Sequence, residues 1–169
     1  AKGFDPDIFD RDAKKIHDLY MSAYEPLENV CRSRSGAREI LVWLKKSGIK
    51  TSIYSNHYVP HIQRQLKRLK LDGFVEDIFG RSIGDYSHMH NRSKEAKLAE
   101  YVRKIRIRPR EVLTVGDTVE EIEIAKNSGY YSAAITGGSN SLIRLKAINP
   151  NFLINNLAEL KDIIKELNS

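Results

Sequence analysis

Apolar residues recur along most of the chain in helical and strand-like patterns that alternate, with short connections marked by glycine and proline between them. Helical spacing of apolar positions predicts helices over residues 36–47, 59–70, 93–105, 119–128, 141–147 and 157–167. Compact apolar runs predict strands over residues 49–54, 77–80, 111–115, 131–136 and 152–154. This alternation is typical of parallel sheets, because two parallel strands need a long crossover between them. It therefore predicts an α/β fold, with a parallel sheet covered by helices on both faces.

Particular residues predict where helices begin and end. Ser35 has the character of an N-cap for the helix that carries Ile40 and Leu44, and Gly48 would end that helix in the left-handed conformation. Gly129 is expected to stop the helix that begins near Val119.

The N-terminal residues 1–34 depart from this alternation. Apolar positions over residues 10–24 have a helical period, and Pro26 is expected to end that helix. No strand pattern precedes it, although a parallel sheet normally begins with a strand. We therefore expect the chain to start part-way through a fold, with a helical segment over residues 1–34 and an α/β core domain over residues 35–169. An incomplete sheet would expose unpaired backbone groups, which favours self-association through its edge.

Composition narrows the class of protein. The 169 residues are 41% hydrophobic and 30% charged, which is typical of one soluble globular domain. No apolar run approaches the roughly 20 residues that span a bilayer, so a membrane partner is not expected. The polar N-terminus does not resemble a signal peptide. The single cysteine, Cys31, excludes a disulfide within the chain and indicates a reducing, cytoplasmic setting.

The net charge of +6 comes with basic clusters over residues 64–70 and 103–110. A nucleic-acid partner is one interpretation, because clustered lysine and arginine displace counterions from phosphates. The other is that these are solvated helix faces, since apolar residues alternate with the charges. We favour the solvated faces, because neither a nucleic-acid-binding motif nor a set of aromatic residues for base stacking accompanies the clusters.

Several polar residues fall where predicted strands end, and there ligands gather in open parallel sheets. Ser55 and Asn56 follow one strand, Lys94 begins a later helix, and Asp117 follows the next strand with Glu121 one helical turn beyond it. A hydroxyl, an ammonium and two carboxylates at one rim suit a phosphate dianion together with a hard divalent cation such as Mg²⁺.

Three segments also carry sequences of a known kind. Residues 53–56 read Ile-Tyr-Ser-Asn, Lys94 stands at a characteristic distance before an acidic segment, and residues 115–122 read Val-Gly-Asp-Thr-Val-Glu-Glu-Ile. These segments resemble motifs II, III and IV of the haloacid dehalogenase (HAD) superfamily of hydrolases, and in particular its phosphoglycolate-phosphatase-like members. Glu121 stands where that family commonly has aspartate. The resemblance covers the chain from about Ser35 to the C-terminus.

The resemblance implies a HAD-like Rossmannoid core and a Mg²⁺-dependent phosphatase that acts on a small phosphorylated metabolite through an aspartyl-phosphate intermediate. Ser55, Asn56 and Lys94 would bind the phosphate, Asp117 would help to hold Mg²⁺, and Glu121 would orient it. Residues 1–34 would then resemble the last helix of the small cap that many members insert after their first motif.

The nucleophile motif of that family, Asp-x-Asp at the end of a strand, has no clear counterpart. Asp5 and Asp7 have the right spacing, but residues 1–4 do not form a buried strand pattern. We therefore favour a capped turn at Asp5–Asp7 and keep the pair as a minor alternative for nucleophile and acid–base.

Two further function classes remain open. One is a non-catalytic HAD-like module that binds phosphate or a partner protein, and the other is a basic RNA-associated domain. The histidines His57, His61, His88 and His90 fit no recognised zinc signature, so we predict loop or helix-surface positions for them, with His57 near the substrate pocket.

Overall fold

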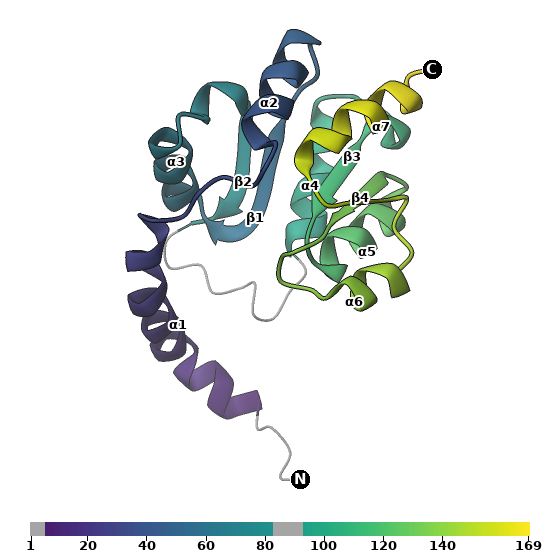
Figure 1. Cartoon of the computed structure of the whole chain (residues 1–169). Helices are drawn as coiled ribbons and strands as arrows, with labels where there is room; N and C mark the ends of the chain where they lie inside the picture. The colour runs from purple at the N-terminus through teal and green to yellow at the C-terminus, as the bar shows by residue number, and fades with distance from the viewer. Residues whose placement is uncertain (1–5, 83–92) are drawn as a thin grey trace.

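The computed structural model describes residues 6–82 and 93–169 and has the α/β fold that the sequence predicts (Figure 1). All strand pairs in this part of the chain are parallel. The strands are β1 (Ser52–Tyr58), β2 (Asp77–Arg81), β3 (Leu113–Gly116), β4 (Tyr131–Ile135) and β5 (Phe152–Ile154). The helices are α1 (Pro6–Glu28), α2 (Ala37–Lys46), α3 (Val59–Arg68), α4 (Ser93–Lys104), α5 (Val119–Ser128), α6 (Leu142–Ala147) and α7 (Leu160–Leu167), with short 3-10 turns η1 (Asp72–Phe74), η3 (Pro109–Glu111) and η4 (Leu157–Glu159).

The strands pair in two groups and not in one continuous sheet. β1 pairs with β2, and β3, β4 and β5 pair in that order. Within residues 6–82 and 93–169, β1 and β3 therefore each keep one edge that no described strand pairs. The prediction of parallel strands is confirmed. The single sheet that the alternation implies is instead two groups, because β1 and β3 do not pair with each other.

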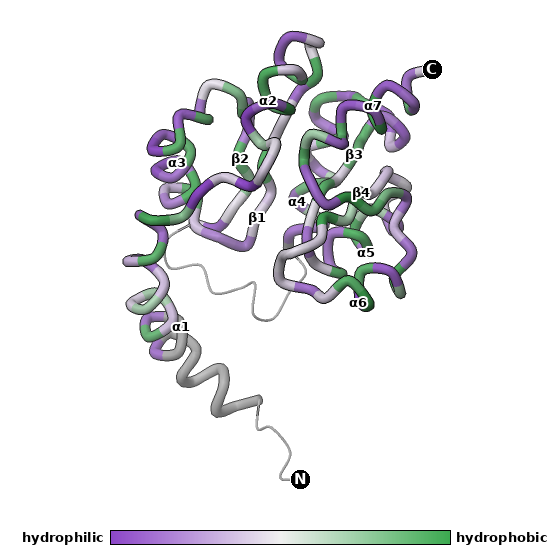
Figure 2. The backbone as a smooth tube through the Cα atoms, in the orientation of Figure 1, coloured by the Kyte–Doolittle hydropathy of each residue, from purple (hydrophilic) through white to green (hydrophobic). Residues whose placement is uncertain are grey.

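Helices cover both faces of the three-stranded group, as predicted. Along β4, Ala133 and Ile135 pack with residues of α2 and α7, whereas Ala134 packs against Ile122 of α5 and Leu145 of α6. Successive side chains of a strand point to opposite faces, so this division places α2 and α7 on one face and α5 and α6 on the other. Figure 2 shows the hydrophobic stretches along β4 and α5 that supply this core.

A second cluster ties the two groups of strands together. Leu98 and Val102 of α4 pack with Ile124 and Ala125 of α5, and Tyr54 of β1 packs against this cluster. β1 belongs to the two-stranded group, whereas α5 packs on the three-stranded group. The hydrophobic contacts around α4 therefore connect the two groups of strands.

The first helix is longer than the sequence predicts. It begins at Pro6 and continues through Pro26 to Glu28, whereas the prediction ended it before Pro26. Proline lacks the N–H that would bond the residue four positions before it, so one hydrogen bond of the preceding turn is lost while the helix continues. The carboxylate of Glu28 is bound by side chains of β1 and α3, which stabilises this last turn.

The expected N-cap at Ser35 is wrong. The N-cap of α2 is Gly36, which has a φ of 76° and makes no side-chain capping bond. The Ser35 hydroxyl instead accepts a hydrogen bond of 3.0 Å from Asn156 Nδ2. A Cβ at position 36 would lie 2.2 Å from Asn156 Oδ1, so glycine is required both by its φ and by this close approach. The left-handed Gly48 after α2 is confirmed.

The strand expected over residues 49–54 is shifted towards the C-terminus. Regular pairing joins Ser52–Tyr54 to β2, then an irregularity separates Tyr54 from the next paired residue, Tyr58. Ser55 and Asn56 therefore lie inside β1, at the position where its regular pairing is interrupted.

No helix in the described part of the chain is long and apolar enough to cross a membrane.

Candidate active site

Lys94 lies in the first turn of α4, and only 7% of its side chain is exposed. Its ammonium group donates a hydrogen bond of 3.2 Å to Glu120 Oε2 and another to Glu121 Oε1. The same group lies 5.1 Å from the centre of the Tyr54 ring. A nearly buried ammonium is thus held between two carboxylates and an aromatic face, beside the N-terminus of α5.

Glu121 is the third residue of α5 and completes a capping box with Thr118. Its Oε2 accepts hydrogen bonds from the backbone N–H of Thr118 at 3.0 Å and from the Thr118 hydroxyl, while Oε1 binds Lys94. A Cβ at Gly116 would lie 2.4 Å from Glu121 Cγ, so glycine at that position makes room for this side chain. Glu121 therefore fixes the strand-to-helix turn in which Asp117 stands.

Asp117 directly follows β3 and is partly exposed. Its Oδ2 accepts hydrogen bonds from Arg34 Nη2 at 3.1 Å and from the backbone N–H of Ser139 at 2.9 Å. A Cβ at Gly138 would lie 1.9 Å from this oxygen, so only glycine allows the loop after β4 to approach so closely. Among the described contacts the hydrogen bonds fall on Oδ2, which leaves Oδ1 as a donor atom for a cation.

Ser55 and Asn56 lie in the irregular part of β1. The Ser55 hydroxyl accepts a hydrogen bond of 3.1 Å from the backbone N–H of His57. The amide of exposed Asn56 lies 3.5 Å from Glu120 Oε2, the same oxygen that binds Lys94. Asn56 and Lys94 are thus joined through one carboxylate.

Some of the predicted site residues contact one another, whereas others contact different residues. Lys94 meets Glu121, and Asn56 reaches Lys94 through Glu120, whereas Asp117 is bound to Arg34 and the loop after β4. Their catalytic and metal-binding roles remain predictions. Of the minor nucleophile candidates, Asp5 lies outside the described residues and Asp7 belongs to the first turn of α1.

Sequence reasoning missed Arg34 and Glu120, both of which contact predicted site residues. Arg34 is separated from Asp117 by 83 positions, and no periodicity connects them. Glu120 stands beside Glu121 in the acidic segment, so its position was a usable signal, although the resemblance assigned it no role.

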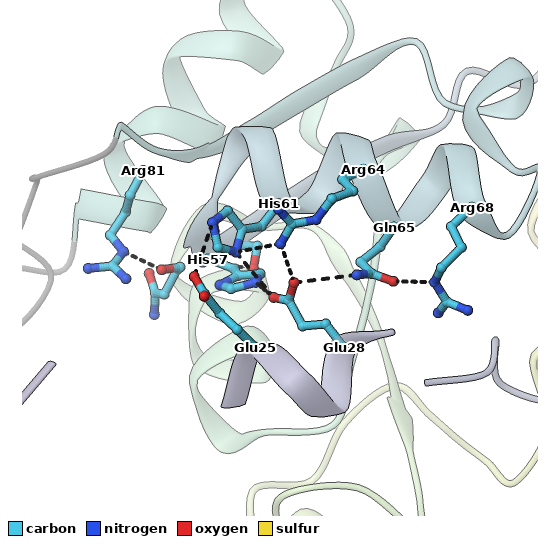
Figure 3. A network of polar contacts seen from close by, with 10 residues as sticks. Glu25, Glu28, His57, His61, Arg64, Gln65, Arg68 and Arg81 are labelled. Atoms are coloured by element: carbon cyan, nitrogen blue, oxygen red, sulfur yellow. Dashed lines mark hydrogen bonds and ion pairs between the residues drawn. The ribbon is translucent and has the colours of Figure 1, made fainter. Parts of the chain in front are cut away.

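The histidine prediction is corrected in part. His57 and His61 were expected on loops or helix surfaces, but their side chains are only 24% and 12% exposed and both approach Glu28 (Figure 3). Glu28 lies on α1, far from them in sequence, so local spacing gave no hint of this acidic partner. His88 and His90 lie outside the described residues.

Comparison with protein families gives a match over residues 5–135 to the model described as haloacid dehalogenase-like hydrolase. The chain belongs to the haloacid dehalogenase-like hydrolases. The resemblance drawn from the three motifs is therefore confirmed, and the hydrolase family matches the expectation of an enzyme.

Curated relatives carry phosphatase names. A phosphoglycolate phosphatase of Pseudomonas putida is 27% identical over 161 residues, which are 95% of this chain and 58% of that protein. The pyrophosphatase PpaX of Bacillus thuringiensis is 27% identical over 90% of this chain and 65% of its own length. The chain thus spans about three fifths of the length of these relatives.

Solved structures of the family share the fold. A haloacid dehalogenase-like hydrolase of Streptococcus pneumoniae superposes with a TM-score of 0.75 at 18% identity, over 91% of this chain and 70% of that one. A haloacid dehalogenase-like protein of Agrobacterium tumefaciens gives 0.74 at 18% identity, over 92% and 70%. At such low identity these likenesses speak for the HAD-like Rossmannoid fold alone.

Proposed function

We propose that this haloacid dehalogenase-like hydrolase is a Mg²⁺-dependent phosphatase that acts on a small phosphorylated metabolite. The observation that carries the proposal is the buried ammonium of Lys94, held by Glu120 and Glu121 beside the turn that contains Asp117. Burying a lysine ammonium costs free energy, so lysine side chains are seldom buried without a charged partner. A buried ammonium at the edge of a parallel sheet where ligands bind fits the binding of an anion there. The phosphatase names of the relatives support the same class of reaction.

Phosphate binding falls to Ser55, Asn56 and Lys94 in this proposal. The ammonium of Lys94 neutralises non-bridging phosphate oxygens, and the Ser55 hydroxyl and Asn56 amide donate hydrogen bonds to others. Asn56 and Lys94 already share the carboxylate of Glu120 as a partner, so an incoming phosphate would exchange with that carboxylate.

The carboxylate of Asp117 would help to hold Mg²⁺, and that of Glu121 would orient the ion. Both are hard oxygen donors, and Asp117 Oδ1 faces no described hydrogen-bond partner, so the donor set suits this ion. Bound Mg²⁺ supplies positive charge that stabilises phosphoryl oxygens in the transition state. Glu121, fixed by Thr118 and Lys94, would position the turn and orient the ion.

The proposed reaction has two steps. An aspartate oxygen attacks phosphorus, the phosphate ester bond breaks, and the leaving alkoxide takes a proton from an acid. Water then attacks the aspartyl-phosphate and releases inorganic phosphate and the free carboxylate. Asp5 and Asp7 remain the minor candidates for the attacking and acid–base groups.

The test is hydrolysis of an aryl phosphate by this chain with and without Mg²⁺, with Asp117→Asn as the site variant and Asp162→Asn as the matched control, since Asp162 is 85% exposed on α7. We expect Mg²⁺-dependent release of phosphate that Asp117→Asn lowers by at least about 100-fold and Asp162→Asn leaves unchanged. Activity that is equal in both variants would contradict the proposal.

A second candidate function is a non-catalytic module that binds phosphate. It is favoured by one observation: the buried ammonium of Lys94 shares the carboxylate of Glu120 with Asn56, a pair of donors that can bind an anion without a nucleophile. Binding of inorganic phosphate that depends on Lys94, without turnover of the aryl phosphate, would select this function over the enzyme.

The partner is proposed to be a small phosphorylated molecule in a reducing, cytoplasmic setting, as expected for a chain whose single thiol, Cys31, is free and exposed. A nucleic acid is disfavoured, because Arg64 and Arg68 of the basic cluster on α3 are engaged by Glu28 and the Cys31 carbonyl. We also propose self-association through the edges of β1 and β3 that no described strand pairs.

A further inference from the structure

We propose that Glu28, His57 and His61 form a binding site for a transition-metal ion of the zinc type, separate from the carboxylates assigned to Mg²⁺. Each side chain offers one donor atom, and these atoms all lie within 4.8 Å of one another. Figure 3 shows the two imidazole rings and the carboxylate of Glu28 pointing toward one another.

One distance within this cluster matches the separation between two ligands of a tetrahedral zinc ion, and a second is shorter. Ligands about 2.0–2.1 Å from such an ion lie about 3.3 Å from each other. His61 Nδ1 is 3.3 Å from Glu28 Oε1, and His57 Nε2 is 2.6 Å from the same oxygen. Entry of the ion therefore requires His57 and Glu28 to separate by about 0.7 Å, which converts a hydrogen bond into two metal–ligand bonds.

Three different elements supply the ligands. Glu28 ends α1, His57 is in β1, and His61 is in the first turn of α3, four positions after His57. The side chain of Glu28 is 3% exposed and that of His61 12%, so the donor atoms are largely shielded from bulk water. An ion here would join α1 to the corner between β1 and α3.

The surroundings give two of the three ligands, Glu28 and His61, a partner on their outer side. Arg64 Nη2 binds Glu28 Oε2 at 2.7 Å, which leaves Oε1 as the oxygen that faces the histidines. Glu25 Oε1 lies 3.8 Å from His61 Nε2, so a small movement would let it accept a hydrogen bond from the N–H that this nitrogen carries when Nδ1 binds a metal. A carboxylate behind a ligating histidine is the usual arrangement at zinc sites.

Arg64 also lies 3.4 Å from His61 Nδ1, a position that opposes a cation. The nitrogen near His61 is Nη2, which also binds Glu28, so entry of the ion requires this side chain, which is 54% exposed, to shift toward solvent. Glu28 supplies the negative charge in this cluster, and Arg64 holds only its other oxygen, Oε2.

The donor set selects the kind of ion. Two imidazole nitrogens and one carboxylate oxygen suit Zn²⁺, Co²⁺ or Ni²⁺, whereas Mg²⁺ prefers oxygen ligands alone. Three protein ligands also leave a fourth position for water. Since His57 follows Ser55 by two positions and Asn56 by one, the ion would lie next to the proposed phosphate-binding residues of β1.

The experiment measures Zn²⁺ affinity of the full chain by competition with a chromophoric chelator, in wild type and in Glu28→Gln, His57→Gln and His61→Gln. We expect one equivalent bound by wild type, affinity lowered by about 100-fold or more in each variant, and no competition by millimolar Mg²⁺. Glu39→Gln, an exposed carboxylate of α2, is the matched control and should bind as wild type does.

A second readout does not depend on the folding of the variants. Co²⁺ in the wild-type site should give the intense visible bands of tetrahedral coordination, and Zn²⁺ should abolish them. A pale octahedral spectrum, or Zn²⁺ affinity that is equal in wild type and the three variants, would overturn the proposal. Asp117→Asn should keep full Zn²⁺ affinity, which separates this site from the proposed Mg²⁺ site.

Discussion

At the scale of single residues, the ion pair between Lys94 and Glu121 is the most demanding interaction in the candidate site. Both side chains are nearly buried, and the carboxylate of Glu121 also caps α5 through Thr118. Removing one partner of a buried pair leaves the other charge without compensation, which costs more than the pair itself contributes.

Lys94→Met is therefore expected to lower the free energy of unfolding by about 3 kcal/mol and to abolish phosphate binding. Urea denaturation and phosphate titration measure the two effects. Lys104→Met, an exposed position on the same helix, should change the free energy of unfolding by less than about 0.5 kcal/mol. Equal effects at both positions would mean that Lys94 is not held as an ion pair in solution.

A second residue-scale prediction concerns the close approach of the loop after β4. Gly138→Ala would place a methyl group against Asp117 Oδ2 and the guanidinium of Arg34, so these side chains must separate. We expect a loss of about 1–3 kcal/mol in stability and a weaker Mg²⁺ response, measured by thermal unfolding with and without the ion. Gly73→Ala is the matched control, because a Cβ there meets no atom within 4 Å.

At the scale of elements, α1 is fixed to the rest of the chain through its last turn. The carboxylate of Glu28 accepts hydrogen bonds from His57 and Arg64 at 2.6 and 2.7 Å. Figure 1 shows the remainder of the helix directed away from the strands. The anchoring of α1 should therefore depend on the charge of this one carboxyl group.

The pH dependence of stability tests this dependence. Burial alone would raise the pKa of Glu28, but hydrogen bonds from Arg64, His57 and His61 lower it from 4.5 to about 2. A lowered pKa stabilises the fold above pH 4.5, and this contribution is lost as the pH falls toward 2. The difference corresponds to about 3 kcal/mol.

Glu28→Gln should remove that part of the pH dependence. Denaturation curves at several pH values between 2 and 7 measure it, with Glu39→Gln as the control that keeps the wild-type slope. The titratable and charged groups around Glu28 are Tyr24 on its own helix, the two histidines and Arg64 on the other elements, and Glu25, which lies 3.8 Å from His61. A wild-type slope retained in Glu28→Gln would assign the effect to these neighbours.

Elements were the level at which the sequence was most informative. Apolar periodicity located the helices and strands from Ser35 onward, because burial on one face leaves a period in the sequence. It placed the strand of Ser55 too early, since the interrupted pairing of β1 has no local signal. Contacts between distant segments, such as Arg34 with Asp117, depend on the assembled fold and leave no pattern in a single chain.

At the scale of the whole molecule, the two groups of strands are held together by the hydrophobic cluster around α4 and by Tyr54. β1 and β3 each keep one edge that no described strand pairs, and such edges pair readily with other chains. We expect the chain to self-associate, with a sedimentation coefficient that rises with concentration. A sedimentation coefficient that stays at the monomer value across the concentration range would contradict self-association through these edges.

The exposed thiol of Cys31 makes the anchoring of α1 directly observable. It is the one cysteine of the sequence and lies three positions after Glu28, at the exit of the helix. A spin label or fluorophore can be attached there without an engineered cysteine. Its mobility should increase when the contacts of Glu28 with β1 and α3 are lost. A label on Cys31 would therefore report how acid, metal ions or substrate change the attachment of α1.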